Sequence, residues 1–404
     1  MDTDKNTAGK RPQALIVGLG IAGMATALRL HQIGWEPVIV ERSPQRRTGG
    51  HLIWLFGAGK ASAQRLGVLE AIGDRSGPET KSWEVDREGR RRPGFVAQGP
   101  LALIRGDVEA GLFSALPGDL EIRYDTVPLR IRENGERARV VLRSGNRESV
   151  QDFDLVIGAD GLRSSVRDMV FGRSSFLHPL NYIVGATLLD RPIDGLTESE
   201  GLVLAEPGRS VMAFPFADRA PSLLFTYRTG DVDAEFTRPP AQSIRRAFGP
   251  EPTGDLLESL FARYEEDPDP LFDSTVQVRM PKWSRGRVAL VGDAAWSLTL
   301  YSGMGASAAL AGAELLGTML ERNAHDPARA LPAWEARMRP FIQEHQDAVE
   351  HERIKFTPKN RREVVLRSLM VRLLSSPRLR PLAQLATGRE KGVAAKDRDV
   401  AAVL

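Results

Sequence analysis

The chain has 404 residues, of which 42% are hydrophobic and 26% charged, a balance typical of a globular protein with room for two domains or one discontinuous domain. It contains no cysteine, which excludes disulfides, thiolate metal sites and enzymes that need a redox-active cysteine pair, and no other metal site is predicted. No apolar run approaches about 18 residues and the first residues lack an apolar signal core, so we expect a cytoplasmic protein that is not integral to a membrane.

The net charge of +3 is unevenly distributed along the chain. From His351 to the end, 13 Lys and Arg residues stand against 5 Asp and Glu residues. A basic segment of this kind could meet an anionic surface, but its cations are spread out and lack interleaved aromatic residues. We therefore favour a solvated helical face and predict no nucleic-acid partner.

The first predicted unit, residues 13–41, is a strand, a glycine turn, a helix and a second strand. The apolar run Ala14–Val17 leads into the sequence GLGIAG at Gly18–Gly23, and a segment rich in alanine and leucine follows it. A second apolar run, Val38–Val40, ends at Glu41. In this context a GxGxxG sequence predicts a dinucleotide site.

Each position of this motif has a physical role. Gly18 permits the tight turn, Gly20 lets the backbone approach a pyrophosphate, and Gly23 lets the helix lie close to the strand. The first helical turn, which includes Ala22, offers amide groups and a partial positive charge to the pyrophosphate. Glu41 can accept hydrogen bonds from both hydroxyls of an adenosine ribose. The motif alone leaves NAD and FAD equally open.

The rest of the chain alternates between helical and strand patterns. From about residue 181 the strand patterns follow one another and predict an antiparallel sheet with helices across it. A later core strand, Val288–Val291, ends at Gly292-Asp293, and a helix of small residues follows at Gly305–Leu320. The remainder is predicted to be helical, with an amphipathic helix over Asn360–Leu374 that would cap a pocket.

Segments with nucleotide-site character lie far apart in the sequence, with sheet-like insertions between them. We therefore predict an α/β fold with a discontinuous Rossmann-like domain that has a parallel sheet, an inserted antiparallel-sheet substrate domain and a C-terminal helical segment. The predicted bounds are 12–75, 101–172 and 281–340 for the first, 76–100 and 173–280 for the second, and 341–404 for the third. Because only one credible GxGxxG is present, enzymes with two nucleotide-binding domains are disfavoured.

Three motifs occur in a characteristic order: GLGIAG with Glu41-Arg42, DLVIGADGLRSSVR at Asp154–Arg167, and GRVALVGDAAWSLTLYSGMGASAALAGAELL at Gly286–Leu316. A weaker fourth, IRGDVEAGL, lies at Ile104–Leu112. Together they resemble the motifs of the single-component, class A FAD-dependent monooxygenases with the p-hydroxybenzoate hydroxylase fold. The resemblance is strongest to a bacterial branch that includes tetracycline-modifying and antibiotic-biosynthesis enzymes, and it covers about residues 12–340.

The resemblance implies a bound FAD, NAD(P)H as a transient reductant, and O2 and an aromatic or polycyclic small molecule as substrates. One oxygen atom would pass to the substrate from a flavin C4a-hydroperoxide. Asp293 would accept hydrogen bonds from ribityl hydroxyls, and the amides of the Gly303-Met304-Gly305 turn would face the flavin ring. Besides these and the first motif, the implied cofactor-binding residues are Arg42, Arg47, Arg105 and Asp160.

This sequence departs from the family pattern at Leu298 and Leu300, where prolines are usual, and at Trp54, where an Asp is common in the branch. Cofactor binding should survive these changes, whereas the oxygenation step is less secure. A flavin oxidase or dehydrogenase on the same scaffold is therefore the alternative. A third reading is a non-catalytic FAD-binding protein whose basic tail docks on a partner or a membrane surface.

The substrate is predicted to lie between the flavin and the inserted sheet. Strand alternation places Met212, Phe214 and Phe216 on one face, and Tyr227 of the next strand is a further candidate contact. An ordinary sheet core would show the same pattern. His51 is the candidate base for a phenol-like substrate, and Met304 is the second residue assigned to the vicinity of the ring.

Overall fold

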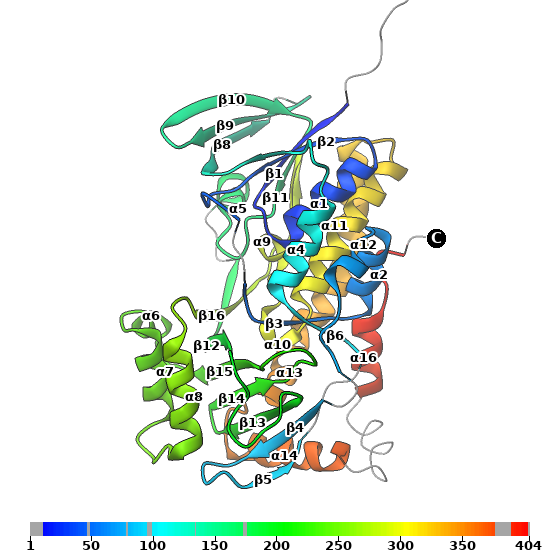
Figure 1. Cartoon of the computed structure of the whole chain (residues 1–404). Helices are drawn as coiled ribbons and strands as arrows, with labels where there is room; N and C mark the ends of the chain where they lie inside the picture. The colour runs from blue at the N-terminus through cyan, green and yellow to red at the C-terminus, as the bar shows by residue number, and fades with distance from the viewer. Residues whose placement is uncertain are drawn as a thin grey trace, which may run out of the picture.

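The computed structural model describes residues 11–46, 49–77, 80–94, 99–133, 135–172, 176–375 and 389–402. Parallel and antiparallel sheets alternate with helices along the chain, and this confirms the predicted α/β class (Figure 1). Arg47, one of the predicted cofactor contacts, lies outside the described residues.

A six-stranded sheet with the order β17-β18-β11-β1-β2-β7 forms the upper part of the molecule (Figure 1). Its strands are β1 (Gln13–Val17), β2 (Glu36–Val40), β7 (Glu121–Arg123), β11 (Leu155–Gly158), β17 (Ser284–Arg285) and β18 (Val288–Leu290). β1 runs parallel to β2 and β11, and β11 runs parallel to β18. The ends of β1, β11 and β18, each followed by one of the motifs, therefore meet at one edge of the sheet.

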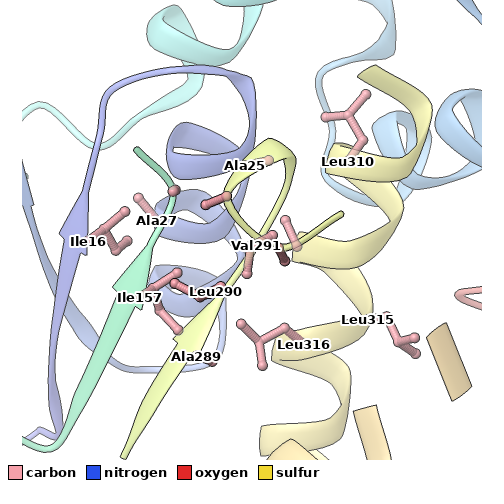
Figure 2. Packing of buried hydrophobic residues seen from close by; sticks show 14 of the residues in the cluster. Ile16, Ala25, Ala27, Ile157, Ala289, Leu290, Val291, Leu310, Leu315 and Leu316 are labelled. Carbon is pink, nitrogen blue, oxygen red and sulfur yellow. The ribbon is translucent and has the colours of Figure 1, made fainter. Parts of the chain in front are cut away.

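Helices pack on this sheet and on one another, and those at residues 21–32 and 305–322 are rich in alanine, leucine and glycine, which lets their backbones approach closely. They are α1 (Ile21–Gln32), α2 (Gly57–Arg65), α3 (Leu69–Ile72), α4 (Arg105–Ala115), α11 (Gly305–Arg322) and α12 (Pro327–Asp347). Figure 2 shows the side chains of Ile16, Ile157 and Leu290 on three neighbouring strands with α1 and α11 beside them. These side chains are fully buried, which makes this layer the main core of the molecule.

Smaller elements complete the upper part. A three-stranded antiparallel sheet, β8 (Thr126–Glu133), β9 (Ala138–Ser144) and β10 (Arg147–Phe153), packs Val140 and Leu142 into the same core. The loops after β11 and β18 lead into α5 (Ser165–Phe171), α9 (Asp293–Trp296) and α10 (Thr299–Ser302). A two-stranded sheet, β3 (Leu52–Leu55) with β6 (Leu101–Ile104), lies between the upper and lower parts of the molecule.

The lower part is a seven-stranded sheet with the order β16-β12-β15-β14-β13-β4-β5. Its strands are β4 (Lys81–Val85), β5 (Arg91–Pro93), β12 (Leu177–Leu188), β13 (Glu200–Glu206), β14 (Arg209–Phe214), β15 (Ser222–Arg228) and β16 (Leu271–Val278). Helices α6 (Val232–Glu235), α7 (Pro240–Phe248) and α8 (Gly254–Glu266) cover one face. The opposite face meets α10 and α13 (Val349–Phe356).

The register of β14 against β15 corrects one predicted substrate contact. Met212 pairs with Leu224, and both lie in a cluster with Tyr301 of α10. Tyr227 pairs with Arg209 and lies in the other cluster, beneath α6–α8, where its hydroxyl donates to Glu235 at 2.9 Å. Because side chains alternate along a strand, Tyr227 and Met212 point to opposite faces, and the prediction for Tyr227 is wrong.

The C-terminal helices are α13 (Val349–Phe356), α14 (Arg361–Ser375) and α16 (Arg389–Asp397). The predicted helix over Asn360–Leu374 is confirmed within one residue at each end by α14. None of the helices in the described part of the chain combines the length and the apolar character needed to cross a membrane.

Candidate functional site

The glycine turn after β1 is tightly packed on one side and open on the other. Gly18 has φ +110°, and a Cβ there would lie 2.5 Å from the carbonyl oxygen of Ala159. A Cβ on Gly23 would lie 2.0 Å from the carbonyl oxygen of Gly18. On Gly20, by contrast, a Cβ would meet no described atom within 4 Å. The backbone at the start of α1 therefore borders open space, as a pyrophosphate cradle requires.

Glu41 is held at the edge of this space by the backbone. One carboxylate oxygen accepts the N–H of Leu19 at 2.9 Å, and the other accepts the N–H of Ser43 at 2.9 Å. Each oxygen has a second lone pair, so the carboxylate retains the capacity to accept hydroxyl groups. Arg42, the next residue, is exposed.

Asp293 lies where β18 meets the start of α1. Gly292 has φ +68°, and a Cβ on it would lie 2.7 Å from the Cβ of Ala22. Position 292 therefore requires glycine, and the small side chain of Ala22 allows the two backbones to approach. The Asp293 side chain is exposed, yet desolvation by the surrounding protein raises its pKa, against the attraction of Arg105. A carboxylate that is open to solvent but walled by protein lies in a deep groove.

Arg105 begins α4 beside the same groove. Its N–H donates to the carbonyl oxygen of His51 at 3.0 Å, and its half-exposed guanidinium pairs with Glu109 at 2.9 Å. Burial, and next the charge of Arg105, lower the pKa of His51 to about 4. His51 is therefore neutral at pH 7 and a weak base, and it is absent from the described lining of the cavity below. The prediction that it deprotonates a substrate loses support.

The carboxylate of Asp160 is hydrogen-bonded to residues at the start of the following helix. Its carboxylate accepts the hydroxyl of Ser164 at 2.5 Å and the backbone N–H groups of Ser165 and Val166 at 2.6 and 3.2 Å. It therefore caps the start of α5. The next residue, Gly161, has φ +80° and no described atom within 4 Å of a built Cβ, so the backbone there is open to a ligand.

Sequence reasoning assigned no role to Arg167, which the structure makes a bridge between two motifs. Its side chain is 3% exposed and donates to the carbonyl oxygens of Leu162 and Ala294 at 2.8 and 3.0 Å. The loop after β11 is thereby tied to the loop after β18. The arginine was visible in the motif, but no local pattern reveals which carbonyl groups it reaches.

The turn before α11 presents backbone rather than side chain to the groove. Gly303 has φ +68°, and a Cβ on Gly305 would meet no described atom within 4 Å. Met304 is 0% exposed, its side chain belongs to the core, and its N–H donates to Ser302 Oγ at 3.0 Å. The side chain of Met304, the cap residue of α11, therefore points into the core, so the predicted place of this residue in the vicinity of the ring would rest on its backbone.

A strained residue precedes this turn. Thr299 stands between Leu298 and Leu300 with φ +63°, a conformation that is unfavourable for a β-branched side chain. Its hydroxyl oxygen is buried without a hydrogen-bond partner among the described residues. Strain of this kind concentrates at functional sites, and it lies where the sequence departs from the proline pattern.

A cavity of about 400 Å³ opens beside the turn. Large apolar side chains form much of its wall: Trp54 of β3, Phe56 just before α2, Met212 and Phe214 of β14, Tyr301 of α10 and Phe356 of α13. Trp54 packs edge-on to Phe214 with ring centroids 5.4 Å apart. A Cβ on Gly303 would lie 3.3 Å from both Trp54 and Phe56, so the cavity begins where the glycine turn ends.

Only some of the predicted substrate residues line the cavity. Met212 and Phe214 line it, whereas Phe216 and Tyr227 are not among its described lining residues. Phe216 is fully buried beyond the end of β14, so strand alternation does not extend to it. Met370, Val371 and Leu374 of α14 form part of the wall, as the predicted cap requires.

Comparison with known proteins identifies the family of the chain. The model of the FAD-binding-domain family matches residues 114–348, more than half of the chain. The chain belongs to this FAD-binding family. Several of its curated relatives carry the name flavin-dependent monooxygenase. One, from an unidentified prokaryote, is 27% identical over 83% of this chain and 88% of its own length. Another, from Legionella longbeachae, is 26% identical over 83% and 87%.

Solved structures share the fold of this family member. The tetracycline destructase Tet(55) superposes with a TM-score of 0.76 at 24% identity, covering 93% of this chain and 97% of its own. Klebsiella pneumoniae HpxO, solved with FAD and uric acid, gives 0.75 at 20% identity, covering 95% and 97%. The open backbone at Gly20 and Gly305 and the groove-facing Asp293 fit an FAD.

We expect Asp293→Asn to change two quantities in opposite directions: it should stabilise the apoprotein at pH 7 and weaken the binding of FAD. A carboxyl whose pKa is raised by folding stabilises the fold below its unfolded pKa, and this contribution is lost as pH rises through the folded pKa. The amide should therefore raise the Tm of the apoprotein at pH 7 but not at pH 4, while FAD binds roughly tenfold more weakly. Thermal melts of the apoprotein and FAD titration check both; a lower Tm at pH 7 contradicts the prediction.

Substitutions on the two faces of the lower sheet should have different effects on ligand binding. Phe214→Ala removes a cavity wall and should weaken binding of anthracene-2-carboxylate about tenfold in calorimetric titration. The matched change Tyr227→Phe, on the opposite face, should leave that affinity unchanged and lower stability by about 1 kcal/mol through loss of the bond to Glu235. Equal effects of the two variants on binding would refute the assignment of faces.

Proposed function

We propose that this protein is an NAD(P)H- and FAD-dependent monooxygenase that uses O2 to hydroxylate or oxygenate an aromatic or polycyclic small molecule. The observation that carries the proposal is the aromatic cavity of about 400 Å³ that begins at Gly303. A planar apolar substrate fits such walls, and a cofactor ring beside the glycine turn would face it.

The proposed cofactor contacts follow the groove. The open backbone at Gly20 and the start of α1 would hold the pyrophosphate, and Glu41 would accept the ribose hydroxyls. Asp293 would accept ribityl hydroxyls. Arg42 and Arg105 would contact phosphate or adenosine, and Gly161 would offer its backbone nearby.

The first N–H groups of α11 have no acceptor within the helix, so they and the positive helix end would stabilise negative charge on the ring bound beside Gly303 and Gly305. Bound FAD would supply hydride acceptance from NAD(P)H and activation of O2. The protein would orient the substrate against Trp54 and Phe214 and exclude water. We also propose the six-stranded sheet and its helices as the FAD-binding domain and the seven-stranded sheet as the substrate domain.

The proposal is tested on the purified holoenzyme. Its flavin spectrum is recorded, NADH or NADPH is added without oxygen, and oxygen is then admitted with and without candidate aromatic compounds. We expect nicotinamide to bleach the flavin and an aromatic substrate to couple reoxidation to product. Reduction of the flavin by the substrate itself would favour the oxidase or dehydrogenase alternative. A flavin that neither nicotinamide nor substrate reduces would leave a non-catalytic FAD-binding protein.

A further inference from the structure

One side of the cavity is charged rather than aromatic. Helices α13, α14 and α16 bring Glu352, Lys355, Arg367 and Lys396 to its lining. All of these residues follow position 348, where the match to the family model ends. The family match therefore does not extend to the charged side of the cavity.

The charge of Arg367 is matched within the protein. Its two terminal nitrogens reach both carboxylate oxygens of Glu84 at 2.5 and 3.0 Å, and its Nε donates to the carbonyl oxygen of Lys355 at 2.9 Å. A bidentate pair of this kind fixes the guanidinium and neutralises it. Arg367 thus holds α14 to the lower sheet.

The two lysines are matched differently, because they share one carboxylate. Lys355 Nζ lies 2.6 Å from Oε1 of Glu352, and Lys396 Nζ lies 3.0 Å from Oε2. The described side chains at this position therefore carry about one unmatched positive charge. Lys355 is 42% exposed at the rim, but the side chain of Lys396 is only 15% exposed, so the unmatched charge is held inside the wall.

The other charged and titratable neighbours do not cancel it. Asp397 also lines the cavity, but its exposed carboxylate is turned to the start of α2, where it accepts the N–H of Gly57 at 2.9 Å. Arg398 pairs with Glu344 at 2.7 Å. Burial lowers the pKa of His345 to about 4, with Lys396 adding to the effect, so this imidazole is neutral at pH 7. Desolvation also lowers the pKa of Lys396 despite the opposing attraction of Glu352. An anion bound beside Lys396 would relieve this cost.

The ammonium of Lys396 also lies against the aromatic wall. Its Nζ is 5.0 Å from the ring centroid of Phe56. Phe56 is one of the two rings that contact Gly303. A molecule whose rings pack on Phe56 and Trp54 therefore has the ammonium of Lys396 within reach of its edge.

We propose that Lys396, oriented by Glu352, is a specificity-determining residue that binds an acidic oxygen of the substrate, a carboxylate, phenolate or enolate. The inference rests on the proposed function, because it takes the cavity as the substrate site. Binding at Lys396 fixes one edge of a planar molecule and so selects which of its atoms faces the glycine turn.

Two probes of equal size and different charge test it: anthracene-2-carboxylate and anthracene-2-carboxamide, titrated into the FAD-loaded enzyme at pH 7. We expect the carboxylate to bind at least about tenfold more tightly than the amide. Lys396→Met should bring this ratio to near one with little change for the amide, whereas Lys396→Arg should keep most of it. Lys359→Met, the same change outside the cavity lining, should leave the ratio unaltered.

Equal binding of the two probes to the wild type, or a ratio unchanged in Lys396→Met, overturns the assignment. Failure of both probes to bind also overturns it, because the cavity would then not be the ligand site. The flavin spectrum of each variant shows that it is folded and loaded. Substrate oxygenation with no preference for an acidic group would refute only the role of Lys396 and leave the proposed function standing.

Discussion

A Gly20→Val variant will fold and will be purified without flavin. A Cβ at this position meets no described protein atom within 4 Å, and the backbone is extended, with φ −87° and ψ −174°, which any residue adopts. The added side chain therefore costs the apoprotein little. It would fill the space at the start of α1 that the pyrophosphate needs, so FAD affinity should fall by at least about a hundredfold.

The measurement compares flavin content with the Tm of the apoprotein. We expect the variant to melt within about 2 °C of wild-type apoprotein and to gain no stability from added FAD, whereas the wild type gains it by mass action. Gly118→Val is the matched control, because its Cβ also meets no described atom and the residue lies in a distant exposed turn. Full flavin content in Gly20→Val would show that the cofactor lies elsewhere.

The second large effect concerns the helix that closes the cavity. Glu363→Gln should destabilise the protein by about 3 kcal/mol, because it removes the bidentate partner of a buried arginine and leaves only one largely exposed carboxylate near it. Arg353 is 2% exposed, and its two terminal nitrogens reach Glu363 at 3.0 and 3.2 Å. The same carboxylate accepts the N–H of Lys359, so α14 would lose its attachment at its first turn.

Glu350→Gln is the matched control for this change. Glu350 also reaches Arg353, at 3.3 Å, but it is 60% exposed where Glu363 is 20% exposed, so its loss should cost less than about 1 kcal/mol. Denaturant unfolding gives the free energy of unfolding of both variants, and a similar decrease of this free energy in the two would contradict the account.

The pH dependence supplies a further check. Burial, the largest single influence, would raise the pKa of Glu363, but the hydrogen bonds from Arg353 and the Lys359 N–H and the charges of both residues together outweigh it, so the net pKa is lowered. A lowered pKa adds stability above the unfolded value, and this is lost as pH falls through the folded pKa. The difference in free energy of unfolding between the wild type and Glu363→Gln should therefore become smaller at acidic pH.

The nucleotide part of the site was readable in the sequence because it depends on local backbone geometry. Gly18, Gly20 and Gly23 each have a steric reason at a fixed spacing, and the structure gives each of them that environment. Glu41 and Asp293 follow core strands whose ends meet at one sheet edge. A strand, a turn and a following helix lie within a short stretch, so no distant contact is needed to predict them.

The proposed substrate part could be predicted only in part, at Met212 and Phe214, because the rest depends on register and on distant packing. Strand alternation could not show whether Tyr227 lies on the same face as Met212, since that is set by the pairing of β14 with β15. The motif named Met304 as a position but could not show that its side chain turns into the core. Lys396 reaches the cavity only because α16 packs against the start of α2, where a Cβ on Gly57 would lie 2.7 Å from Asp397.

The central claim is that the groove and the cavity together deliver one atom of O2 to an aromatic molecule. It is tested most directly with ¹⁸O2, the holoenzyme, NADPH and an aromatic compound chosen because it accelerates NADPH oxidation. The account predicts a product that carries one ¹⁸O atom, detected by mass spectrometry. An oxidised product that carries no label would contradict it and assign the protein to the oxidases or dehydrogenases.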